Sequence, residues 1–594
     1  MIIFRNKYLV ITFLTAVTVL LFSNFLFAKI KEYKNILSQK DTKVYSEIFK
    51  IQKLPIKNKK SKEWKKVDEL ISKLDNKILL GNVYAERFLH PTGWRSSFKD
   101  LKLWLEKYND HPDATRISRI ALKRKPKNSK NPKNPTKGFL NGYGTYKSNS
   151  LKPKFPLKNH KFSKYSYLTS IKFRRAINKR NTKYAENLLN SKKVKKYLTK
   201  NELSQLRAEL SHAFFIFDND YKAVRQARLS ISLSEKPNPL ALWAGGLASW
   251  RNEDIKLSKY FFNKLSENSF GPDGIVAGGG YWSARVAFVL GNSKKAYYFL
   301  SRAAKHERTF YGSVAMASLG YKYNPDFNLP KFNLSLIKKI IKHKGGLRAL
   351  ALLEVDQFHK AAREFRKIIP KFDINDYPDL LSFTSTNKMP GLTFRLAAIL
   401  RNDHGKILLG GLYPIPSWET ETSDLKDRAL VYAIARQESG FNPRAKSSSK
   451  AMGIMQIIPS TAAFIMKDRE YRLRRSKNHL LYNPHHNISI GTKYMKFLLK
   501  LPIINQDLMW MLASYNAGPG NFKKWTKDKK YKLTDTLLML ESLPARETRN
   551  YIKLVLTNLW IYKIRFKQEN EILSTLASGK SIDFKVFFKH EKGS

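Results

Sequence analysis

The sequence predicts an all-α protein in which a long superhelix of paired helices precedes a smaller C-terminal block. Apolar residues recur with the 3.6-residue period of a helix through most of the chain, and no convincing strand pattern interrupts them. Trp243 and Trp282, 39 residues apart, each lie in a predicted helix that precedes an Asn-containing turn and a second amphipathic helix. Paired helices at this period are typical of a right-handed solenoid, in which neighbouring pairs bury each other's faces.

The composition limits the chemistry and the partners. With 594 residues, 42% of them hydrophobic, the chain is long enough for several folded domains. It has no cysteine, which excludes disulfides, thiol nucleophiles and zinc–cysteine sites. A net charge of +63 favours anionic polymers or membrane surfaces, or reflects a lysine-rich composition that decorates solvated faces. Zinc-finger spacing, aromatic RNA-binding motifs and basic zippers are missing, so we expect no nucleic acid partner.

The first 28 residues have the pattern of an export signal. Arg5 and Lys7 precede an apolar run over residues 8–28, which ends on a small residue. At about 20 residues the run is also long enough to span a membrane. We therefore expect an exported protein with a cleaved leader, and an uncleaved N-terminal anchor is the alternative.

Changes in composition divide the rest of the chain into five segments. These are a helical N-terminal region (29–122), a basic linker or loop rich in Pro, Asn and Lys (123–163), the α-helical solenoid (164–409), the C-terminal block (410–566) and a tail (567–594). The N-terminal region has helical periodicity around Trp64 and again over residues 97–122. The basic segment has no apolar period, so we expect a solvated tether. Residues 347–369 form a third, degraded unit of the solenoid.

One carboxylate stands out in the C-terminal block. Val431, Ile434 and Ala435 define the apolar face of a helix, and Glu438 is next in that series. A carboxylate on a face toward the core is costly unless it is paired, protonated or used, and burial would raise its pKa into the range of a general acid. The alternative is a partly exposed Glu at a helix end, because Gly440 resembles a C-terminal stop. Ser423 is the expected N-cap of this helix.

The residues after Glu438 resemble the wall of a cleft. Ser447 and its neighbours make a polar loop, and Gly453 allows the backbone to approach closely, as a substrate requires. The amide of Gln456 lies between two apolar residues, so it needs a partner. Pro459 is placed to begin the next helix.

Four ordered motifs follow one another in this block. The first is ESGFNPRAKSSSKAMGIMQIIPST, which begins at Glu438, and the second is Asn483-Pro484 with Asn487-Ile488, Gly491 and Tyr494. The third is Ala513-Ser514-Tyr515-Asn516-Ala517-Gly518. The fourth is Leu543-Pro544 with Glu547-Thr548-Arg549 and Tyr551. Together they resemble the soluble lytic transglycosylases, goose-lysozyme-like enzymes that cut bacterial peptidoglycan. Residues 278–304 are similar to the helical domain of the large members. One departure is Lys450, where the family usually has Gly. The resemblance therefore does not predict the shape of the loop around this residue.

The resemblance implies both fold and chemistry. It implies a ring or U-shaped superhelix followed by a lysozyme-like, mainly α catalytic domain, in a periplasmic protein without cofactor or metal. The implied reaction cleaves the β-1,4 bond between N-acetylmuramic acid and N-acetylglucosamine and forms 1,6-anhydro-N-acetylmuramic acid. Glu438 would act as acid and then base, because no second carboxylate lies between Ser439 and Lys467. The implied partner is the glycan strand of peptidoglycan, with the positive charge adding attraction to an anionic membrane or wall.

The resemblance also implies roles for residues around Glu438. Ser447 and Gln456 would hydrogen-bond the muramic acid, and Met455 would line the floor. Tyr515 would position the acid or the sugar, and Asn516 would bond backbone or substrate. Glu547 and Tyr551 would bind a sugar or order the cleft, or would serve only a structural hydrogen-bond network. The adjacent His485 and His486 are expected in a loop and not as a metal pair. A hydrolase of the goose-lysozyme kind and a non-catalytic peptidoglycan-binding scaffold are the alternative functions.

Overall fold

The structure is a computed structural model that describes most of the chain after the leader. The described residues are 36–54, 56, 58, 61–90, 93–140, 163–418, 428–473, 477–527 and 535–580. Their regular elements are all helices, which confirms the all-α prediction, and they contain two isolated β-bridges, Lys446 with Met452 and Met452 with Ile457. The predicted leader and the expected N-cap at Ser423 lie outside the described residues. No described helix combines the length and the apolar character needed to cross a bilayer.

The N-terminal region is a bundle of five short helices. They are α2 (Gln39–Ile51), α3 (Lys62–Ser72), α4 (Leu80–Phe88), α5 (Phe98–Tyr108) and α6 (Ala114–Lys123). The helical region expected over residues 97–122 is therefore two helices, separated by a turn that contains Pro112, which has no N–H to donate. Ser97 begins α5 with a capping box in which its hydroxyl accepts from the Asp100 N–H.

The basic segment after α6 is not a free tether in its described part. Residues 124–140 form no helix, yet they run against α19 (Phe358–Ile368). The Leu140 N–H donates to the Arg366 carbonyl oxygen at 2.8 Å, and the Arg366 guanidinium donates back to the Leu140 carbonyl oxygen. The Lys367 ammonium donates to the Thr136 carbonyl oxygen at 2.5 Å. The composition correctly predicted that this segment has no helix. It could not predict the attachment to α19, because a backbone carbonyl accepts hydrogen bonds in every residue type.

The predicted superhelix follows in ten helices. They are α7 (Lys164–Asn178), α8 (Thr182–Asn190), α9 (Lys192–Tyr197), α10 (Lys200–Ile216), α11 (Asp220–Ile231), α12 (Pro239–Arg251), α13 (Ile255–Ser266), α14 (Asp273–Val289), α15 (Ser293–Ala304) and α16 (Phe310–Ser318). The repeat corresponds to the hairpins α12–α13 and α14–α15. Trp243 and Trp282 both pack on Phe262, with ring centroids 6.0 and 5.6 Å apart, so these aromatic rings are core, as expected.

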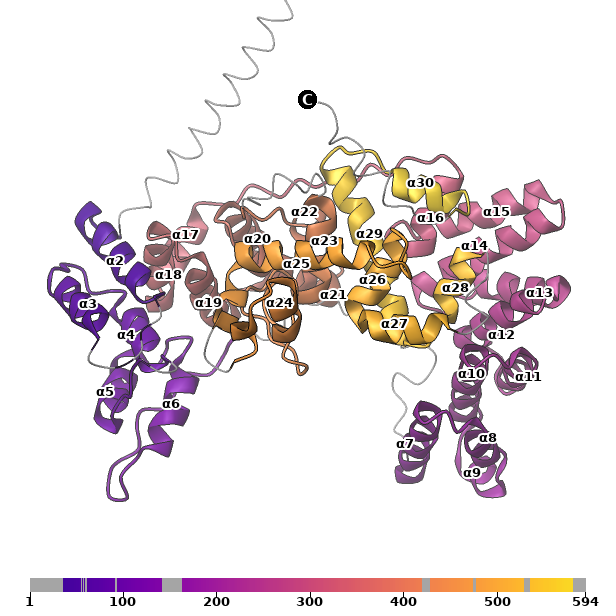
Figure 1. Ribbon diagram of the computed structural model, residues 1–594, viewed down its shortest axis with the longest axis horizontal. Coiled ribbons are helices and arrows are strands. Elements are labelled where there is room, and N and C mark those ends of the chain that lie inside the picture. The colour runs from indigo at the N-terminus through magenta and orange to yellow at the C-terminus, as the bar shows by residue number, and fades with distance from the viewer. Residues whose placement is uncertain are drawn as a thin grey trace, which may run out of the picture.

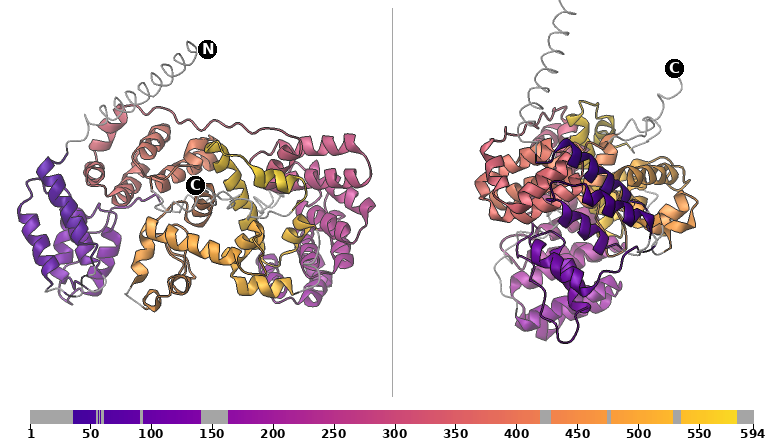
Figure 2. Two further views of the ribbon diagram at one scale, coloured as in Figure 1. Left: turned by 45° about the horizontal axis from the view of Figure 1, so that its top comes forward. Right: turned by 90° about the vertical axis from the view of Figure 1, so that its left-hand side faces the viewer.

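An extended segment interrupts the array between residues 320 and 333. It contains Pro325 and Pro330, and it runs along the back of the molecule from α16 to α17 (Ser335–Ile341) (Figure 2). The Arg565 guanidinium lies 4.8 Å from the Phe327 ring centroid, which ties the segment to the C-terminal block. The array then resumes with α18 (Lys344–Glu354), α19, α20 (Tyr377–Thr386), α21 (Pro390–His404) and α22 (Leu409–Leu412). Helices α18 and α19 form the third helical pair that residues 347–369 predicted.

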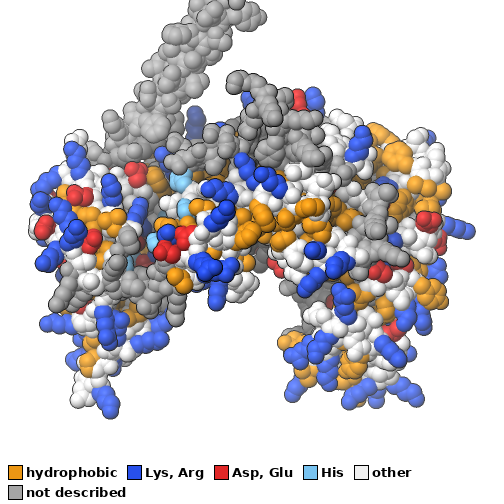
Figure 3. Space-filling model, in the orientation of Figure 1, with side chains coloured by type: hydrophobic (Ala, Val, Ile, Leu, Met, Phe, Trp, Pro, Cys, Tyr) orange, Lys and Arg blue, Asp and Glu red, His pale blue; other side chains and the backbone are white. Residues whose placement is uncertain are grey.

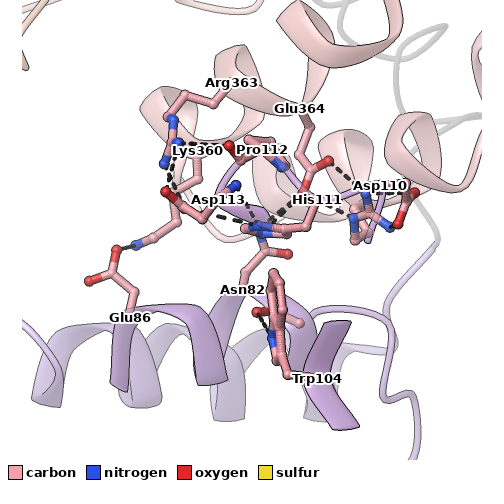
Figure 4. Close-up of polar contacts among 12 residues, drawn as sticks. Asn82, Glu86, Trp104, Asp110, His111, Pro112, Asp113, Lys360, Arg363 and Glu364 are labelled. Atoms are coloured by element: carbon pink, nitrogen blue, oxygen red, sulfur yellow. Dashed lines mark hydrogen bonds and ion pairs between the residues drawn. The ribbon is translucent and has the colours of Figure 1, made fainter. Parts of the chain in front are cut away.

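The described helices form an open arch. Figure 1 shows α2–α6 at one end, α7–α9 at the other, and the C-terminal helices between them. The N-terminal bundle is joined to α18 and α19 by a buried polar network (Figure 4). The Arg348 guanidinium pairs with Glu364 at 2.9 Å and with Asp110 at 3.0 Å, and Glu364 also accepts from the Asn82 amide at 3.1 Å. A buried carboxylate with this many donors is satisfied, although such a pair adds specificity more than stability.

The C-terminal block is built around one long helix. Its helices are α23 (Arg428–Ser439), α24 (Pro459–Ile465), α25 (Pro484–Leu499), α26 (Leu508–Ala517), α27 (Pro519–Thr526), α28 (Thr536–Ser542), α29 (Arg546–Arg565) and α30 (Glu571–Ala577), with 3-10 turns at Arg469–Tyr471 and Lys477–Tyr482. Helix α29 packs against both α23 and α26. The predicted tail contains α30, whose Ile572 and Leu576 are buried where it meets α16.

Helix α28 fastens this block to the superhelix. Its N-cap Asp535 pairs with Arg285 at 2.9 Å, and that guanidinium also lies over the rings of Trp250 and Trp282. The Glu541 carboxylate accepts from the Tyr311 hydroxyl at 2.8 Å and from Lys553 at 2.7 Å. These contacts fix the orientation of the block relative to the superhelix.

Candidate active site

Glu438 is the penultimate residue of α23. The helix stops at Gly440, whose φ of +56° belongs to the left-handed region that favours glycine, as the sequence predicted. The Ser439 hydroxyl bonds the carbonyl oxygens of Ala435 at 3.1 Å and Ile454 at 2.8 Å, so the helix end is joined to the loop that follows. Helix α23 is buried along nearly its whole length, and the Glu438 side chain is partly buried at its end.

The surroundings of Glu438 favour its protonated form. Its pKa is raised to about 7, chiefly by burial, and the negative charge of Glu547 contributes in the same direction. The hydroxyl of Tyr551 acts in the opposite direction and lowers the pKa, although no hydrogen bond of standard geometry is formed by that hydroxyl among the described residues. The last turn of a helix also disfavours an anion. At neutral pH this carboxyl can therefore both donate and accept a proton.

Two helices bring aromatic hydroxyls to Glu438. Tyr515 comes from α26 and Tyr551 from α29, and the charge of Glu438 contributes to raising the pKa of both phenols above their usual value, after burial. The Tyr515 hydroxyl donates to the Met455 carbonyl oxygen at 2.9 Å. The structure thus gathers Glu438, Tyr515, Tyr551 and, through its charge, Glu547. Glu547 is exposed in the first turn of α29, where a carboxylate is favourable.

Asn487 holds the loop of residues 440–458 in shape. Its amide nitrogen donates to the carbonyl oxygens of Met452 at 3.0 Å and Leu481 at 2.9 Å, and its amide oxygen accepts from the Met455 N–H at 2.8 Å. The side chain is completely buried on α25. Asn487 belongs to the second of the four motifs, but the resemblance implies no role for it. A buried Asn on a helix face is the signal that would have found it, because a buried amide needs several partners.

The close backbone approach at Gly453 is made by the protein itself. Gly453 has a φ of +80°, and an added Cβ would overlap the Leu481 carbonyl oxygen and the Asn487 amide. The expected close approach is thus to Leu481 and Asn487 and not to a substrate. The correction follows from the packing of the loop on α25, which leaves no room for a side chain at this position.

The loop residues Ser447 and Gln456 are partly exposed and held by local bonds. The Ser447 hydroxyl oxygen accepts from the Ala451 N–H at 3.0 Å. The Gln456 amide donates to the Gly453 carbonyl oxygen at 2.7 Å, which supplies the partner that the sequence required. Lys450 has a φ of +65°, in the left-handed region. This backbone conformation favours glycine, which explains why the family usually has Gly at this position. The turn still closes, since the Lys450 N–H donates to the Ser447 carbonyl oxygen at 3.1 Å.

Two further site residues make contacts within the protein. Met455 is completely buried against Gly491, so its side chain supports the loop from below and does not reach the surface. Ile458 lies three residues after Met455, and its side chain is 41% exposed to solvent. The Asn516 amide oxygen accepts from the Thr548 hydroxyl at 2.8 Å, which links α26 to α29 through a side chain and not through backbone.

The adjacent histidines lie in the first turn of α25 and not in a loop. The ring nitrogen Nε2 of His486 lies 2.6 Å from the Tyr471 hydroxyl. Pro484 begins this helix and Asn483 caps it, which the loop prediction overlooked. Within the described ranges no group of three or more His, Asp or Glu side chains could hold a metal ion.

Comparison with known proteins agrees with this geometry. Residues 418–538, which contain Glu438 and Tyr515, match the family model described as the transglycosylase SLT domain. The C-terminal block therefore contains a transglycosylase SLT domain. The soluble lytic murein transglycosylase of Salmonella typhimurium is 28% identical over 299 residues, 50% of this chain and 45% of that protein. The membrane-bound lytic murein transglycosylase E of Buchnera aphidicola is 38% identical over 109 residues, 18% of this chain and 49% of that protein.

Solved structures of lytic transglycosylases share the fold of this chain. Lytic transglycosylase Slt of Pseudomonas aeruginosa, solved as an inactive mutant, superposes with a TM-score of 0.55 at 17% identity, covering 90% of this chain and 81% of that one. The 70 kDa soluble lytic transglycosylase of Escherichia coli gives 0.50 at 16% identity, covering 89% and 97%. The matched sequence spans a little under half the length of the curated soluble relatives. The superhelical arrangement predicted from the repeat is thereby confirmed.

Proposed function

We propose that this protein is a peptidoglycan lytic transglycosylase in which Glu438 is the catalytic acid and then the base. The observation that carries the proposal is the Glu438 carboxyl, whose pKa is raised to about 7 inside an SLT domain. A general acid is most effective when its pKa lies near the working pH. Glu547, the neighbouring carboxylate, acts on Glu438 through its charge and stands on the exposed start of α29.

The reaction needs one carboxyl because the substrate supplies the nucleophile. Glu438 donates its proton to the glycosidic oxygen between N-acetylmuramic acid and N-acetylglucosamine as the C1–O bond breaks. The ionised Glu438 then takes the proton of the C6 hydroxyl of the same muramic ring, and that oxygen forms a bond to C1. The products are a free 4-hydroxyl on the leaving sugar and a 1,6-anhydro ring, and no water is consumed.

The other residues of the site position this exchange. The Tyr551 hydroxyl stabilises ionised Glu438, and the charge of Glu547 opposes ionisation, so together they keep the two forms close in energy. Tyr515 supports the loop through Met455, which places the partly exposed Ser447 and Gln456 to hydrogen-bond the N-acetylmuramic acid. Asn516 holds α26 against α29. We also propose a periplasmic location, since the sequence carries an export pattern and peptidoglycan is outside the cytoplasm.

Product analysis on purified sacculi tests the proposal. We expect mass spectrometry to find 1,6-anhydromuropeptides with the parent protein and none with Glu438→Gln. Glu106→Gln is the matched control, because Glu106 is exposed on α5 at the N-terminal end of the arch. Reducing ends in place of anhydro ends would mean a goose-lysozyme-like hydrolase. Unchanged product release by Glu438→Gln would remove Glu438 from the mechanism, and sacculus binding without any release would leave only a scaffold.

A further inference from the structure

The far end of the superhelix carries an unusual concentration of positive charge. Helices α7–α9 and their connections, residues 164–200, form a lobe that we call the basic arm, at the end of the arch opposite α2–α6 (Figure 1). Its twelve Lys and Arg residues are Lys164, Lys172, Arg174, Arg175, Lys179, Arg180, Lys183, Lys192, Lys193, Lys195, Lys196 and Lys200. Its only acidic residue is Glu186.

The overall composition does not account for this arm. The chain has 110 basic and 47 acidic residues, and at that ratio twelve basic residues would come with about five acidic ones. All twelve basic side chains are exposed. Only Arg174 forms an ion pair with a described carboxylate, Glu209 of α10 at 2.8 Å. Glu186 is half-buried and is already engaged by Gln226 at 2.8 Å and Lys222 at 3.5 Å of α11. The arm thus presents uncompensated positive charge to solvent, which attracts an anionic surface.

Exposed aromatic and apolar side chains lie among these charges. Tyr167, Leu168, Tyr184 and Tyr197 are 58%, 46%, 47% and 52% exposed. The ring of Tyr197 lies 5.2 Å from that of Tyr165, which joins α9 to α7. In Figure 3 the lower edge of this lobe shows Lys and Arg side chains with apolar groups between them.

This combination distinguishes between anionic partners. A charged polymer would be held by the cations alone, and exposed Leu168 and the tyrosines would gain little from it. At a bilayer surface, tyrosine rings are favoured at the level of the headgroups, and lysine stems lie along apolar surface while their ammonium groups reach the phosphates. We propose that the basic arm docks on the anionic lipid headgroups of a membrane surface. This proposal is independent of the proposed catalytic function.

The energetics favour a reversible attachment. Each basic residue near an anionic leaflet adds to the attraction, which falls off within a Debye length, about 8 Å at physiological salt. Several of the arm's cations acting together are therefore enough for binding that salt can reverse. An apolar segment such as residues 8–28, if retained, would supply a second attachment.

Vesicle binding by the full chain tests the proposal. The probe is vesicles of phosphatidylcholine, with or without 30% phosphatidylglycerol, in a sedimentation assay. The variant K192Q/K193Q/K195Q/K196Q removes four charges from α9 with little change in helix propensity. The matched control K294Q/K295Q/K305Q/K322Q removes four exposed charges from elsewhere. Both retain the leader, so its contribution cancels. A second variant, K164Q/K172Q/K179Q/K183Q, tests α7 and α8 if the first is poorly folded by circular dichroism.

We expect the parent to bind the anionic vesicles at least tenfold more tightly than the neutral ones. The arm variants should lose at least tenfold of that binding, and the control should stay within about threefold of the parent. Raising the salt concentration should abolish the difference between parent and arm variants. Equal losses in arm and control variants would overturn the proposal in favour of net charge. Vesicle binding that is unchanged in the arm variants would also overturn the proposal. If the arm variants instead lost binding only to purified sacculi, the partner of the arm would be the cell wall.

Discussion

The hydroxyl of Tyr515 on α26 donates a hydrogen bond of 2.9 Å to the carbonyl oxygen of Met455 in the loop after Glu438. The Met455 N–H donates to Asn487 on α25, so this one residue is held between two helices through its backbone. The loop is therefore fixed from both sides, independently of the Met455 side chain. A proton-transferring carboxyl needs such fixed surroundings, because a small displacement of the site costs much of the rate.

The first prediction concerns the pH dependence of cleavage. A general acid must be protonated, and Glu438 has a pKa of about 7. The rate of anhydromuropeptide release should therefore fall on the alkaline side of pH 7, by about tenfold per pH unit once most of the carboxyl is ionised. The measurement is initial rate against pH on purified sacculi. A rate that is flat between pH 6 and pH 9 would contradict the assignment of Glu438 as acid.

Two substitutions should shift the alkaline limb of the pH profile, where the rate falls, in opposite directions. Tyr551→Phe removes the hydroxyl that lowers the Glu438 pKa, so the limb should move to higher pH. Glu547→Gln removes the charge that raises the pKa, so the limb should move to lower pH. Each shift should be within about one pH unit, since a unit corresponds to about 1.4 kcal/mol. Shifts of the same sign would mean that these residues act through the shape of the cleft.

Glu438 should also link stability to pH. Its pKa in the folded state is raised from 4.5 to about 7, so folding favours the protonated carboxyl. The stabilisation present below pH 4.5 is lost as the pH rises through 7. Glu438→Gln should therefore raise the free energy of unfolding at pH 8 by about 1 to 3 kcal/mol and leave it nearly unchanged at pH 4. Denaturant titrations at the two pH values measure this, and an equal gain at both would point to a packing effect.

Gly453 should tolerate no side chain. Gly453→Ala forces a Cβ into the Leu481 carbonyl oxygen at a φ of +80°, and we expect a loss of about 2 to 4 kcal/mol in unfolding free energy together with loss of activity. Gly520→Ala is the control, because an added Cβ there meets no atom within 4 Å. Thermal unfolding of both variants compares them. A Gly453→Ala protein as stable as the control would mean that the loop packs differently on α25.

The attachment of the N-terminal bundle should depend on Arg348. Arg348→Met leaves the Glu364 carboxylate buried without its strongest partner, which typically costs about 3 to 5 kcal/mol. Hydrogen exchange should increase in α4 and α19, on both sides of the network. Lys339→Met is the control, since its ion pair with Asp376 is exposed and contributes little. Equal exchange in the two variants would show that other contacts hold the bundle.

Much of the site could be predicted because the chemistry was concentrated in sequence. Glu438 and the loop to Thr461 are contiguous, and Gly440 and Pro459 mark the ends of their helices as expected. The contacts that hold that loop could not be derived from periodicity. Asn487, Tyr515 and Tyr551 come from three other helices, and periodicity does not show which side chains from separate helices meet.

Local sequence was enough to predict the all-α class, the paired-helix repeat and Glu438 as the candidate acid, because helical periodicity and helix-ending residues are local properties. The folded chain adds that Leu481 and Asn487 leave no room for a side chain at Gly453, that Met455 is held through its backbone, and that residues 136–140 lie on α19. Most of these contacts involve backbone atoms of residues far apart in the sequence. Backbone groups are the same in every residue, so composition and spacing carry no record of their partners.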